Sequence, residues 1–360
     1  MSDTAEILFN VRNRIGWIML NRPKAYNAFS GDMGMQMFKK LKEWAEDDRI
    51  VAVVVEGAGE KAFCAGGDMR HIYELGPSDA HSFAEHAYGE EYKMNLLISE
   101  YPKSIVMILD GYVMGSGCGI SFASHYKIVT EKTKWAMPEL NIGYFPDVGA
   151  SYFLNRAPGF AGHYLALTGS IITAGDVMKI QAGDYFMEHD KINDFKVSLE
   201  KMVWMPPYVD NQLRMIMKNF VETNDKMLSP ALSYEKIDKH FSHDSVEGIM
   251  TSLQAIQNED DWARETVEKL SKMPPTSLKV TLKQLKRGES MDVKACLQMD
   301  LDLSMSFMKY DDLYEGVRAV LIDKDRNPVW KPDKLSDVSA ETVDSYFQYD
   351  WRDRRNKLSK

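Results

Sequence analysis

The sequence predicts an α/β fold in which a layered core is followed by a mostly helical C-terminal region. The β-branched run Val51–Glu56 and the apolar run Ile105–Leu109 are typical of strands buried on both faces. A helical pattern separates these strands, which implies a right-handed crossover. From Phe160 onward the apolar spacing is mostly that of helices. With 360 residues the chain is long enough for one large core with a sizeable appendage, or for two cores.

The first predicted elements are two short strands and a helix. Residues Glu6–Val11 and Ile15–Leu20 have the composition and alternation of paired strands. Ser30 is suited to cap a helix that we expect over Met33–Asp47, just before the buried strand.

Two glycine-rich turns follow predicted strands. The first begins with Gly57–Ala62, which formally matches a dinucleotide-binding fingerprint but is not followed by the helix that such a site needs. It continues through Ala65-Gly66-Gly67, where the lack of bulky side chains lets backbone N–H groups approach a ligand. After a helix predicted over Ser78–Glu100 and the strand at 105–109, Asp110–Gly119 forms the second turn.

The second turn opens an apolar helix predicted over Gly117–Ser124. Together the two turns can present one backbone amide each to a single anionic oxygen. Taken alone, each turn is explained as well by the tight connection that it makes.

Glu139 and Asp147 lie in the segment Met137–Gly149, among glycine, proline and apolar residues. A poorly hydrated carboxyl group has a raised pKa, which suits it to proton transfer or nucleophilic attack near neutral pH. Two ordinary acids in a surface loop remain the alternative for this segment alone. The neighbouring elements are expected to be strands at Tyr126–Thr130 and Thr133–Ala136 and a helix at Val148–Asn155.

By pattern, residues 1–200 form the core that carries the site, and residues 201–360 form a helical region and tail. Asp311–Ile322 is predicted to be the last well-packed helix, with Trp330 and Trp351 anchoring the tail. Earlier helices are predicted at Phe160–Leu167, Ala174–Gln181 and Lys191–Met202, with several more between Gln212 and Met308.

The composition excludes several classes of partner. A net charge of −9 disfavours a broad nucleic-acid or anionic-membrane surface, because phosphate binding needs clustered Lys and Arg. No apolar run reaches about 18 residues, and the first residues lack a secretory signal pattern. Cys64, Cys118 and Cys296 are scattered, which argues against disulfides and a zinc site. We therefore expect a cytoplasmic protein.

No metal site is predicted. His240 and His243 are three residues apart and could share a metal on one helix face, but no third ligand is near in the sequence. A solvated helix face is the favoured interpretation.

Four segments occur in an order that resembles the crotonase (enoyl-CoA hydratase/isomerase) superfamily. The resemblance implies a ClpP/crotonase-like spiral of β-β-α units with a helical C-terminal region. It also implies an oxyanion hole formed by two backbone amides, which by position are those of Gly67 and Ser116. Ser116 stands where many members have glycine, but the amide rather than the side chain is the donor. The segments are Asn21-Arg22-Pro23-Lys24-Ala25-Tyr26-Asn27-Ala28, Ala62–Asp68, Gly111–Gly119 and Met137-Pro138-Glu139.

Two features distinguish branches of this superfamily. Hydratases resemble one another in using two glutamates, at the positions of Gly119 and Glu139 here, and Gly119 carries no carboxylate for water addition. Asp147 in Phe145-Pro146-Asp147, Glu91, and the tail Tyr314–Pro328 are instead similar to the 3-hydroxyisobutyryl-CoA hydrolase branch.

This resemblance implies hydrolysis of a small acyl-CoA thioester, 3-hydroxyisobutyryl-CoA of valine catabolism, with coenzyme A as part of the substrate and no separate cofactor. Glu139 would act as nucleophile or general base, and Asp147 would orient the substrate hydroxyl or the water. Glu91 would hold the acyl end, while Ala65 and Lys24 would lie along the CoA channel.

Two other functions stay open from the sequence. One is an enoyl-CoA hydratase or isomerase that acts on another small acyl-CoA, and the other is a catalytically silent acyl-CoA binder. A homo-oligomer, either a trimer or a dimer of trimers, is common in the superfamily and is a further expectation.

Overall fold

The computed structural model describes residues 5–221 and 228–349. The chain forms two compact units, each built from three separate stretches of sequence. Of the described residues, unit 1 comprises those within 5–67, 93–135 and 172–232, and unit 2 comprises those within 68–92, 136–171 and 233–349. The predicted boundary at residue 200 divides the chain in another way and stays a prediction.

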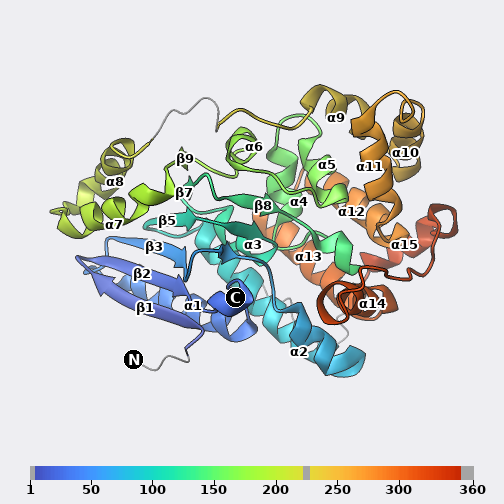
Figure 1. The fold of residues 1–360 in the computed structure, drawn as a ribbon. Helices are drawn as coiled ribbons and strands as arrows, with labels where there is room; N and C mark the ends of the chain where they lie inside the picture. Colours follow the sequence, from blue (N-terminus) through green and yellow to red (C-terminus); the bar gives the residue numbers. More distant parts are fainter. Residues whose placement is uncertain (1–4, 222–227, 350–360) are drawn as a thin grey trace. The chain divides into compact units, whose positions relative to one another are not determined.

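Unit 1 contains a six-stranded sheet with the strand order β1-β2-β3-β5-β7-β9 (Figure 1). β1 and β2 pair as an antiparallel hairpin, and every later pair in the sheet is parallel. The last strand was not predicted, because two residues are too few to show an alternating pattern. The strands are β1 (Ile7–Arg12), β2 (Ile15–Leu20), β3 (Ala52–Gly57), β5 (Ser104–Leu109), β7 (Tyr126–Val129) and β9 (Tyr185–Phe186).

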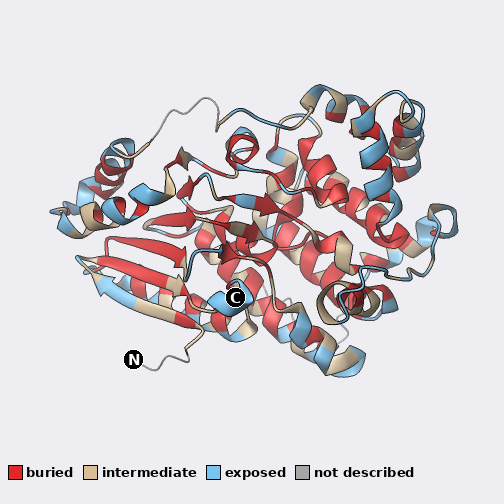
Figure 2. Ribbon diagram, in the orientation of Figure 1, coloured by how far each residue is buried: buried red, intermediate tan, exposed pale blue. Residues whose placement is uncertain are grey.

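The central strands of this sheet are buried on both faces, as their composition predicted, and Figure 2 shows β2 and β3 in the buried colour. Neighbouring side chains of β2 point to opposite faces. A Cβ on Gly16 would lie 2.5 Å from the Trp44 ring on α1 (Gly31–Glu46), so that ring requires glycine there. Trp17 belongs instead to the apolar cluster that includes Phe195 and Leu213. These two residues lie on α7 (Ile192–Lys201) and α8 (Val209–Lys218).

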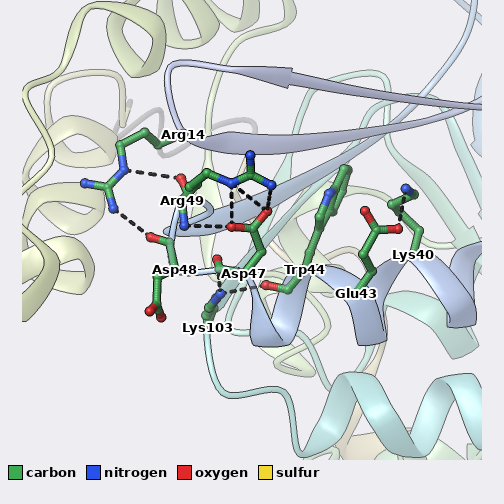
Figure 3. Close-up of polar contacts among 8 residues, drawn as sticks. All are labelled: Arg14, Lys40, Glu43, Trp44, Asp47, Asp48, Arg49 and Lys103. Atoms are coloured by element: carbon green, nitrogen blue, oxygen red, sulfur yellow. Dashed lines mark hydrogen bonds and ion pairs between the residues drawn. The ribbon is translucent and has the colours of Figure 1, made fainter.

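The C-terminal end of α1 is fixed by charged side chains (Figure 3). Lys103 Nζ donates to the carbonyl oxygens of Trp44 at 2.6 Å and Asp47 at 2.8 Å. A cation at this position stabilises the negative end of the helix dipole. Arg14, in the turn between β1 and β2, donates to the carbonyl oxygens of Asp48 and Arg49. The predicted N-cap of α1 is confirmed, since Ser30 Oγ accepts from Met33 N–H.

A second sheet has the order β4-β6-β8. β4 and β6 pair in parallel, so their carboxyl ends meet at the same edge. Both strands lie within the predicted glycine-rich turns and were not predicted, because each has only three residues. The second turn opens α3, as predicted. The segment Gly57–Ala62 leads from strand to strand without a helix, which is not the setting of a dinucleotide fingerprint. These elements are β4 (Ala62–Cys64), β6 (Tyr112–Met114), β8 (Lys134–Ala136) and α3 (Ser116–Ser121), and unit 1 also contains α6 (Ala174–Lys179).

Unit 2 is mainly helical, and its last stretch agrees with the helical C-terminal region that the sequence predicted. Much of α4, α5, α12 and α13 is buried (Figure 2). α2 (Met69–Ser99) runs from unit 2 into unit 1 and has a kink at Gly76, where φ is 70°. The other helices are α4 (Ala150–Phe153), α5 (Ala161–Thr168), α9 (Tyr234–Phe241), α10 (Val246–Gln254), α11 (Asp261–Ser271), α12 (Pro275–Gly288), α13 (Val293–Phe307), α14 (Asp311–Val317) and α15 (Ala340–Tyr346).

Short helical turns complete both units. They are 3-10 helices at Pro23–Ala25, Glu139–Ile142, Leu154–Arg156, His189–Lys191, Pro206–Tyr208 and Leu335–Asp337, and a π-helical turn at Arg318–Ile322.

Three predictions about the helical region need correction. α2 begins at Met69 rather than Ser78, because the kink lets two helical segments join across Pro77. The segment 311–322 is not the last packed helix, since α15 follows and buries Val343 and Tyr346. His240 is not solvated; it is 2% exposed, and its Nδ1 lies 2.7 Å from Ser252 Oγ.

The predicted tail anchors are tested in part. Trp330 Nε1 donates to the carbonyl oxygen of Lys272 at 2.8 Å, which fastens the tail within unit 2. Trp351 lies outside the described residues. Among the described residues, no helix is both long and apolar enough to span a membrane, and no group of three or more His, Cys, Asp or Glu is arranged to hold a metal ion.

Candidate active site

The two predicted oxyanion-hole residues lie close together in unit 1. A Cβ built on Gly67 would lie 3.3 Å from Ser116 Oγ. This proximity follows from the parallel pairing of β4 and β6, because each residue comes shortly after the end of one of these strands. The backbone between strand and helix is unusual at Gly115, where φ is 49° and ψ is −117°, and only glycine adopts such a conformation easily.

The backbone N–H groups of these residues are suited to bind an anion. Phe29 bridges to Gly67, and its N–H donates to the carbonyl oxygen of Gly66 at 2.8 Å. In such a parallel bridge the N–H of Gly67 itself points away from Phe29. Ser116 is the first residue of α3, and first-turn N–H groups have no acceptor within their own helix. Two amide donors are thus present at one edge of the small sheet.

Gly117 keeps the two turns in contact. A Cβ at this position would lie 2.4 Å from the carbonyl oxygen of Cys64, which is far below any real contact. Only glycine therefore allows α3 to start against the end of β4. Gly119, two residues later, is buried within α3 and presents no carboxylate.

Lys24 and Ala65 belong to neighbouring segments of unit 1. The loop that carries Lys24 is joined to the first glycine-rich turn, since Ala65 N–H donates to the carbonyl oxygen of Tyr26 at 3.1 Å. Asn27 holds this loop in place, because its amide donates to the carbonyl oxygens of Ala58 and Ala62 at 2.9 and 2.8 Å. Lys24 is exposed, which leaves its charge free to meet a ligand at the surface.

Glu139, Asp147 and Glu91 all belong to unit 2, and all three are buried. Glu139 is the first residue of a 3-10 helix, and its Oε2 is buried without a hydrogen-bond partner. Burial and the nearby charge of Asp147 raise the pKa of the Glu139 carboxyl well above its usual range. A buried carboxyl oxygen without a partner in the protein is the state expected of a group that reacts with a substrate or a water.

Asp147 is held by a tyrosine that the sequence did not single out. Tyr92, on α2, donates its hydroxyl proton to Asp147 Oδ2 at 2.7 Å. Burial raises the pKa of Asp147 to about 6, although this hydrogen bond opposes the rise. The same hydroxyl lies 2.9 Å from Ser304 Oγ, which also accepts from Tyr144 at 2.7 Å.

Glu91 lies in the same electrostatic neighbourhood. Burial raises the pKa of the Tyr88 hydroxyl, and the charges of Asp147 and Glu91 raise it further. Tyr88 therefore lies close to both carboxylates, and the Tyr88 and Tyr92 rings stack with centroids 6.0 Å apart. Tyr88 thus interacts electrostatically with both Asp147 and Glu91, and Asp147 interacts in the same way with Glu139.

The turn after Asp147 is strained. Val148 has a φ of 54° and Gly149 a φ of 90°, so two successive residues adopt left-handed conformations. For a β-branched residue such as Val148 this costs about 1–3 kcal/mol. Strain of this kind persists only where the surroundings enforce it, and it is concentrated at functional sites.

The comparison with protein-family models covers nearly the whole chain. The family model described as enoyl-CoA hydratase/isomerase matches residues 15–347. The chain belongs to this family. The resemblance predicted from the sequence is thereby confirmed at the level of the superfamily.

Curated relatives in this family are similar over nearly their full length. A protein named 3-hydroxyisobutyryl-CoA hydrolase, mitochondrial, from Gallus gallus is 39% identical over 96% of this chain and 89% of its own length. Proteins of the same name from Xenopus laevis and Homo sapiens are 41% and 37% identical, over 92% and 95% of this chain and 86% and 88% of their own lengths. These names match the branch that Asp147, Glu91 and the tail resembled.

Solved structures confirm the crotonase-like α/β fold. A crystal structure described as a carnitinyl-CoA dehydratase from Mycobacterium thermoresistibile has a TM-score of 0.87 and 33% identity, covering 96% of this chain and 97% of its own. One described as an enoyl-CoA hydratase from Rhodobacter sphaeroides has a TM-score of 0.82 and 30% identity, with coverage of 95% and 97%.

Proposed function

We propose that this enzyme hydrolyses a small acyl-CoA thioester and that 3-hydroxyisobutyryl-CoA is its substrate. The observation that carries the proposal is the buried carboxyl of Glu139, whose Oε2 has no partner and whose pKa is raised beside Asp147. The names of the curated relatives support the substrate. The absence of a carboxylate at Gly119 supports hydrolysis over hydration.

In the proposed mechanism the thioester carbonyl oxygen binds the N–H groups of Gly67 and Ser116. These donors stabilise the negative charge that develops on this oxygen, and loss of one such donor typically raises the barrier by about 3–4 kcal/mol. The tetrahedral species then collapses as the C–S bond breaks, and the electron pair leaves with the sulfur of CoA.

Glu139 initiates the reaction in one of two ways. It attacks the carbonyl carbon to form an anhydride that water later cleaves, or it removes a proton from a water that attacks directly. In the second case Glu139 then passes the proton to the departing CoA sulfur. ¹⁸O found in Glu139 after a single turnover in H₂¹⁸O would establish the anhydride, since direct attack of water on the thioester places ¹⁸O only in the released acid.

The remaining predicted residues bind the substrate in this proposal. Asp147 orients the hydroxyl of the acyl group or the water, and Glu91 holds the acyl end. Lys24 and Ala65 line the path of the CoA moiety. Coenzyme A enters as part of the substrate, and a cytoplasmic location and a trimeric assembly stay predictions.

The test is the substitution Glu139→Gln, which keeps the size of the side chain and removes its charge. Release of free CoA thiol should fall about 1,000-fold or more, while calorimetry should show nearly unchanged binding of the CoA ester. Glu259→Gln, at an exposed glutamate, is the matched control and should retain full turnover. Normal thiol release by Glu139→Gln would contradict the proposal.

A hydratase is the second candidate, because both solved structures above carry hydratase or dehydratase descriptions. A panel of small saturated and 2-enoyl CoA esters separates the two activities. Thiol release identifies the hydrolase, whereas loss of double-bond absorbance without thiol release identifies a hydratase. A protein that binds these esters and does neither is a silent binder.

A further inference from the structure

The turn that carries Asp147 is clamped by two side chains from the C-terminal helices of the same unit. Gln284, on α12, donates from Nε2 to the carbonyl oxygen of Pro146 at 2.7 Å. Asp300, on α13, accepts at Oδ2 from the N–H of Gly149 at 2.7 Å. The two bonds thus fix the chain immediately before and shortly after Asp147.

The two clamping side chains also hold each other. Gln284 Nε2 donates to Asp300 Oδ1 at 2.8 Å, so both oxygens of this carboxyl group accept a hydrogen bond. Gln284 and Asp300 are both 0% exposed. A buried polar pair is expensive to maintain, and sequence patterns alone would favour apolar residues at both positions.

The turn needs such a clamp. Val148 and Gly149 have left-handed backbone conformations, and a β-branched residue leaves that region unless its neighbours prevent it. Relaxation of Val148 would rotate the preceding peptide group and carry the Asp147 side chain with it. The clamp opposes this movement from both ends of the turn.

α13 supports both partners of the Tyr92–Asp147 hydrogen bond. One turn after Asp300, Ser304 Oγ lies 2.9 Å from the Tyr92 hydroxyl and donates to the carbonyl oxygen of Asp300 at 2.7 Å. The same helix therefore holds the turn through the Asp300 carboxyl group and places the Ser304 hydroxyl against that of Tyr92.

We propose that Asp300, held by Gln284, is a positioning residue that keeps the strained turn 146–149 in place so that Asp147 stays bonded to Tyr92. The relevance to catalysis rests on the proposed function, which places Asp147 at the substrate. The conformational role does not depend on the reaction.

The primary variant is Asp300→Asn. An asparagine has one acceptor oxygen, so it serves either Gly149 N–H or Gln284 Nε2 and turns an NH₂ group toward the other. Burial and the charge of Asp147 raise the pKa of Asp300 well above its usual range, which favours its neutral form, so the substitution removes little charge beside Asp147. The Tyr92–Asp147 bond should weaken, and the pKa of Asp147 should therefore rise. Displacement of Asp147 should lower kcat about 100-fold with little change in KM. The control is Asp302→Asn, two residues away on α13, where the carboxylate bonds to Gln298.

Two readouts test the role. The first is the titration of the Asp147 carboxyl by NMR in enzyme with ¹³C-labelled aspartate, assigned by its loss in Asp147→Asn. The second is a double-mutant cycle on kcat with Tyr92→Phe. Because both changes act on one hydrogen bond, their effects should be strongly non-additive, whereas general destabilisation gives additive effects.

An unchanged Asp147 titration in Asp300→Asn, or additive effects in the cycle, would overturn the proposal. If Asp300→Asn does not fold, Gln284→Met removes both donated bonds while keeping a similar shape, and the same criteria apply to it. The NMR readout requires no turnover. A wild-type protein without thioesterase activity would therefore refute the proposed function, while the titration would still decide the positioning role.

Discussion

The hydroxyl of Tyr92 donates to Oδ2 of Asp147 at 2.7 Å, within a cluster in which neither group is exposed to bulk water. This bond stabilises the ionised form of the carboxyl, because a carboxylate accepts it better than a carboxylic acid does. It therefore holds the pKa of Asp147, about 6, below the value that burial alone would produce. The tyrosine keeps an otherwise dry acid available in its charged form near neutral pH.

Tyr92→Phe should shift the acidic limb of the pH–kcat/KM profile to higher pH. Removal of the donor raises the pKa of Asp147, and a hydrogen bond to a charged group contributes about 1.5–3 kcal/mol. The profile reports apparent pKa values of the Glu139 and Asp147 pair rather than of either group alone. The control is Tyr101→Phe, which removes another buried hydroxyl, one that donates to the carbonyl oxygen of Leu41 at 2.8 Å. If wild type, Tyr92→Phe and Tyr101→Phe all had their acidic limb at the same pH, Tyr92 would not set the pKa of Asp147.

Asp147→Asn should stabilise the protein at pH 8 and have much less effect below pH about 4. The fold raises this pKa from 3.8 to about 6, so it favours the protonated form. The Asp147 carboxyl contributes its full stabilisation of the fold below its pKa in the unfolded chain, 3.8, and this contribution is lost as the pH rises through about 6. At 1.36 kcal/mol per pKa unit, the loss is about 3 kcal/mol.

Thermal unfolding of wild type and Asp147→Asn between pH 4 and 8 measures this effect. The difference in melting temperature should grow with pH, and activity should be lost at every pH. Asp302→Asn, with its partly exposed carboxyl, should show no such growth. If the difference in melting temperature does not depend on pH, burial does not disfavour the ionised form of Asp147.

The sequence singled out Glu139 and Asp147 as candidate site residues and did not identify the residues that contact them. Glu139 and Asp147 were visible because acids are rare among proline, glycine and apolar residues. Asp300 gave the same signal, an acid in the apolar helical stretch of α13, but its partner Gln284 lies on another helix. Contacts between residues that are far apart in sequence leave no local pattern to read. Tyr92 was hidden for the same reason, since a tyrosine in an amphipathic helix is usually core.

Strands were predictable where burial on both faces makes a segment almost entirely apolar. β3 and β5 were found from apolar runs, and the N-cap of α1 from one serine. The start of α2 was missed because a Gly-Pro pair ordinarily ends a helix, and here it makes a kink within one. The buried state of His240 was missed because its partner Ser252 lies on the next helix.

Gly117→Ala should nearly abolish activity. Its Cβ would lie 2.4 Å from the carbonyl oxygen of Cys64, so α3 must move away from β4 and carry the amide of Ser116 with it. Because misplacement by about 1 Å can cost about 100-fold in rate, kcat should fall at least this far. Assays of thiol release and binding of a CoA ester measure the change. Gly248→Ala in α10 is the control, since its φ is not positive and the nearest atom to its Cβ, at 3.1 Å, belongs to the side chain of exposed His243.

The position of Glu139 depends on two glycines that interlock its 3-10 helix with α14. A Cβ on Gly316 would lie 2.2 Å from the carbonyl carbon of Ile142, and one on Gly143 would lie 2.0 Å from the carbonyl oxygen of Asp312. Both near-contacts are with backbone, which cannot rotate away as a side chain can. The C-terminal helix α14 is therefore fitted directly to the turn that carries the proposed catalytic carboxylate.

Gly316→Ala should separate these elements, with a loss of about 1–3 kcal/mol in the free energy of unfolding. The turn at 139–142 would shift with the separation, so kcat should fall more than the loss of stability explains at temperatures where the variant is fully folded. Chemical denaturation and thiol-release assays on the same preparations measure the two effects. The control is Gly248→Ala in α10, where the nearest contact, 3.1 Å, is with the side chain of exposed His243. A folded Gly316→Ala enzyme with full kcat would show that α14 stabilises the fold without setting the position of Glu139.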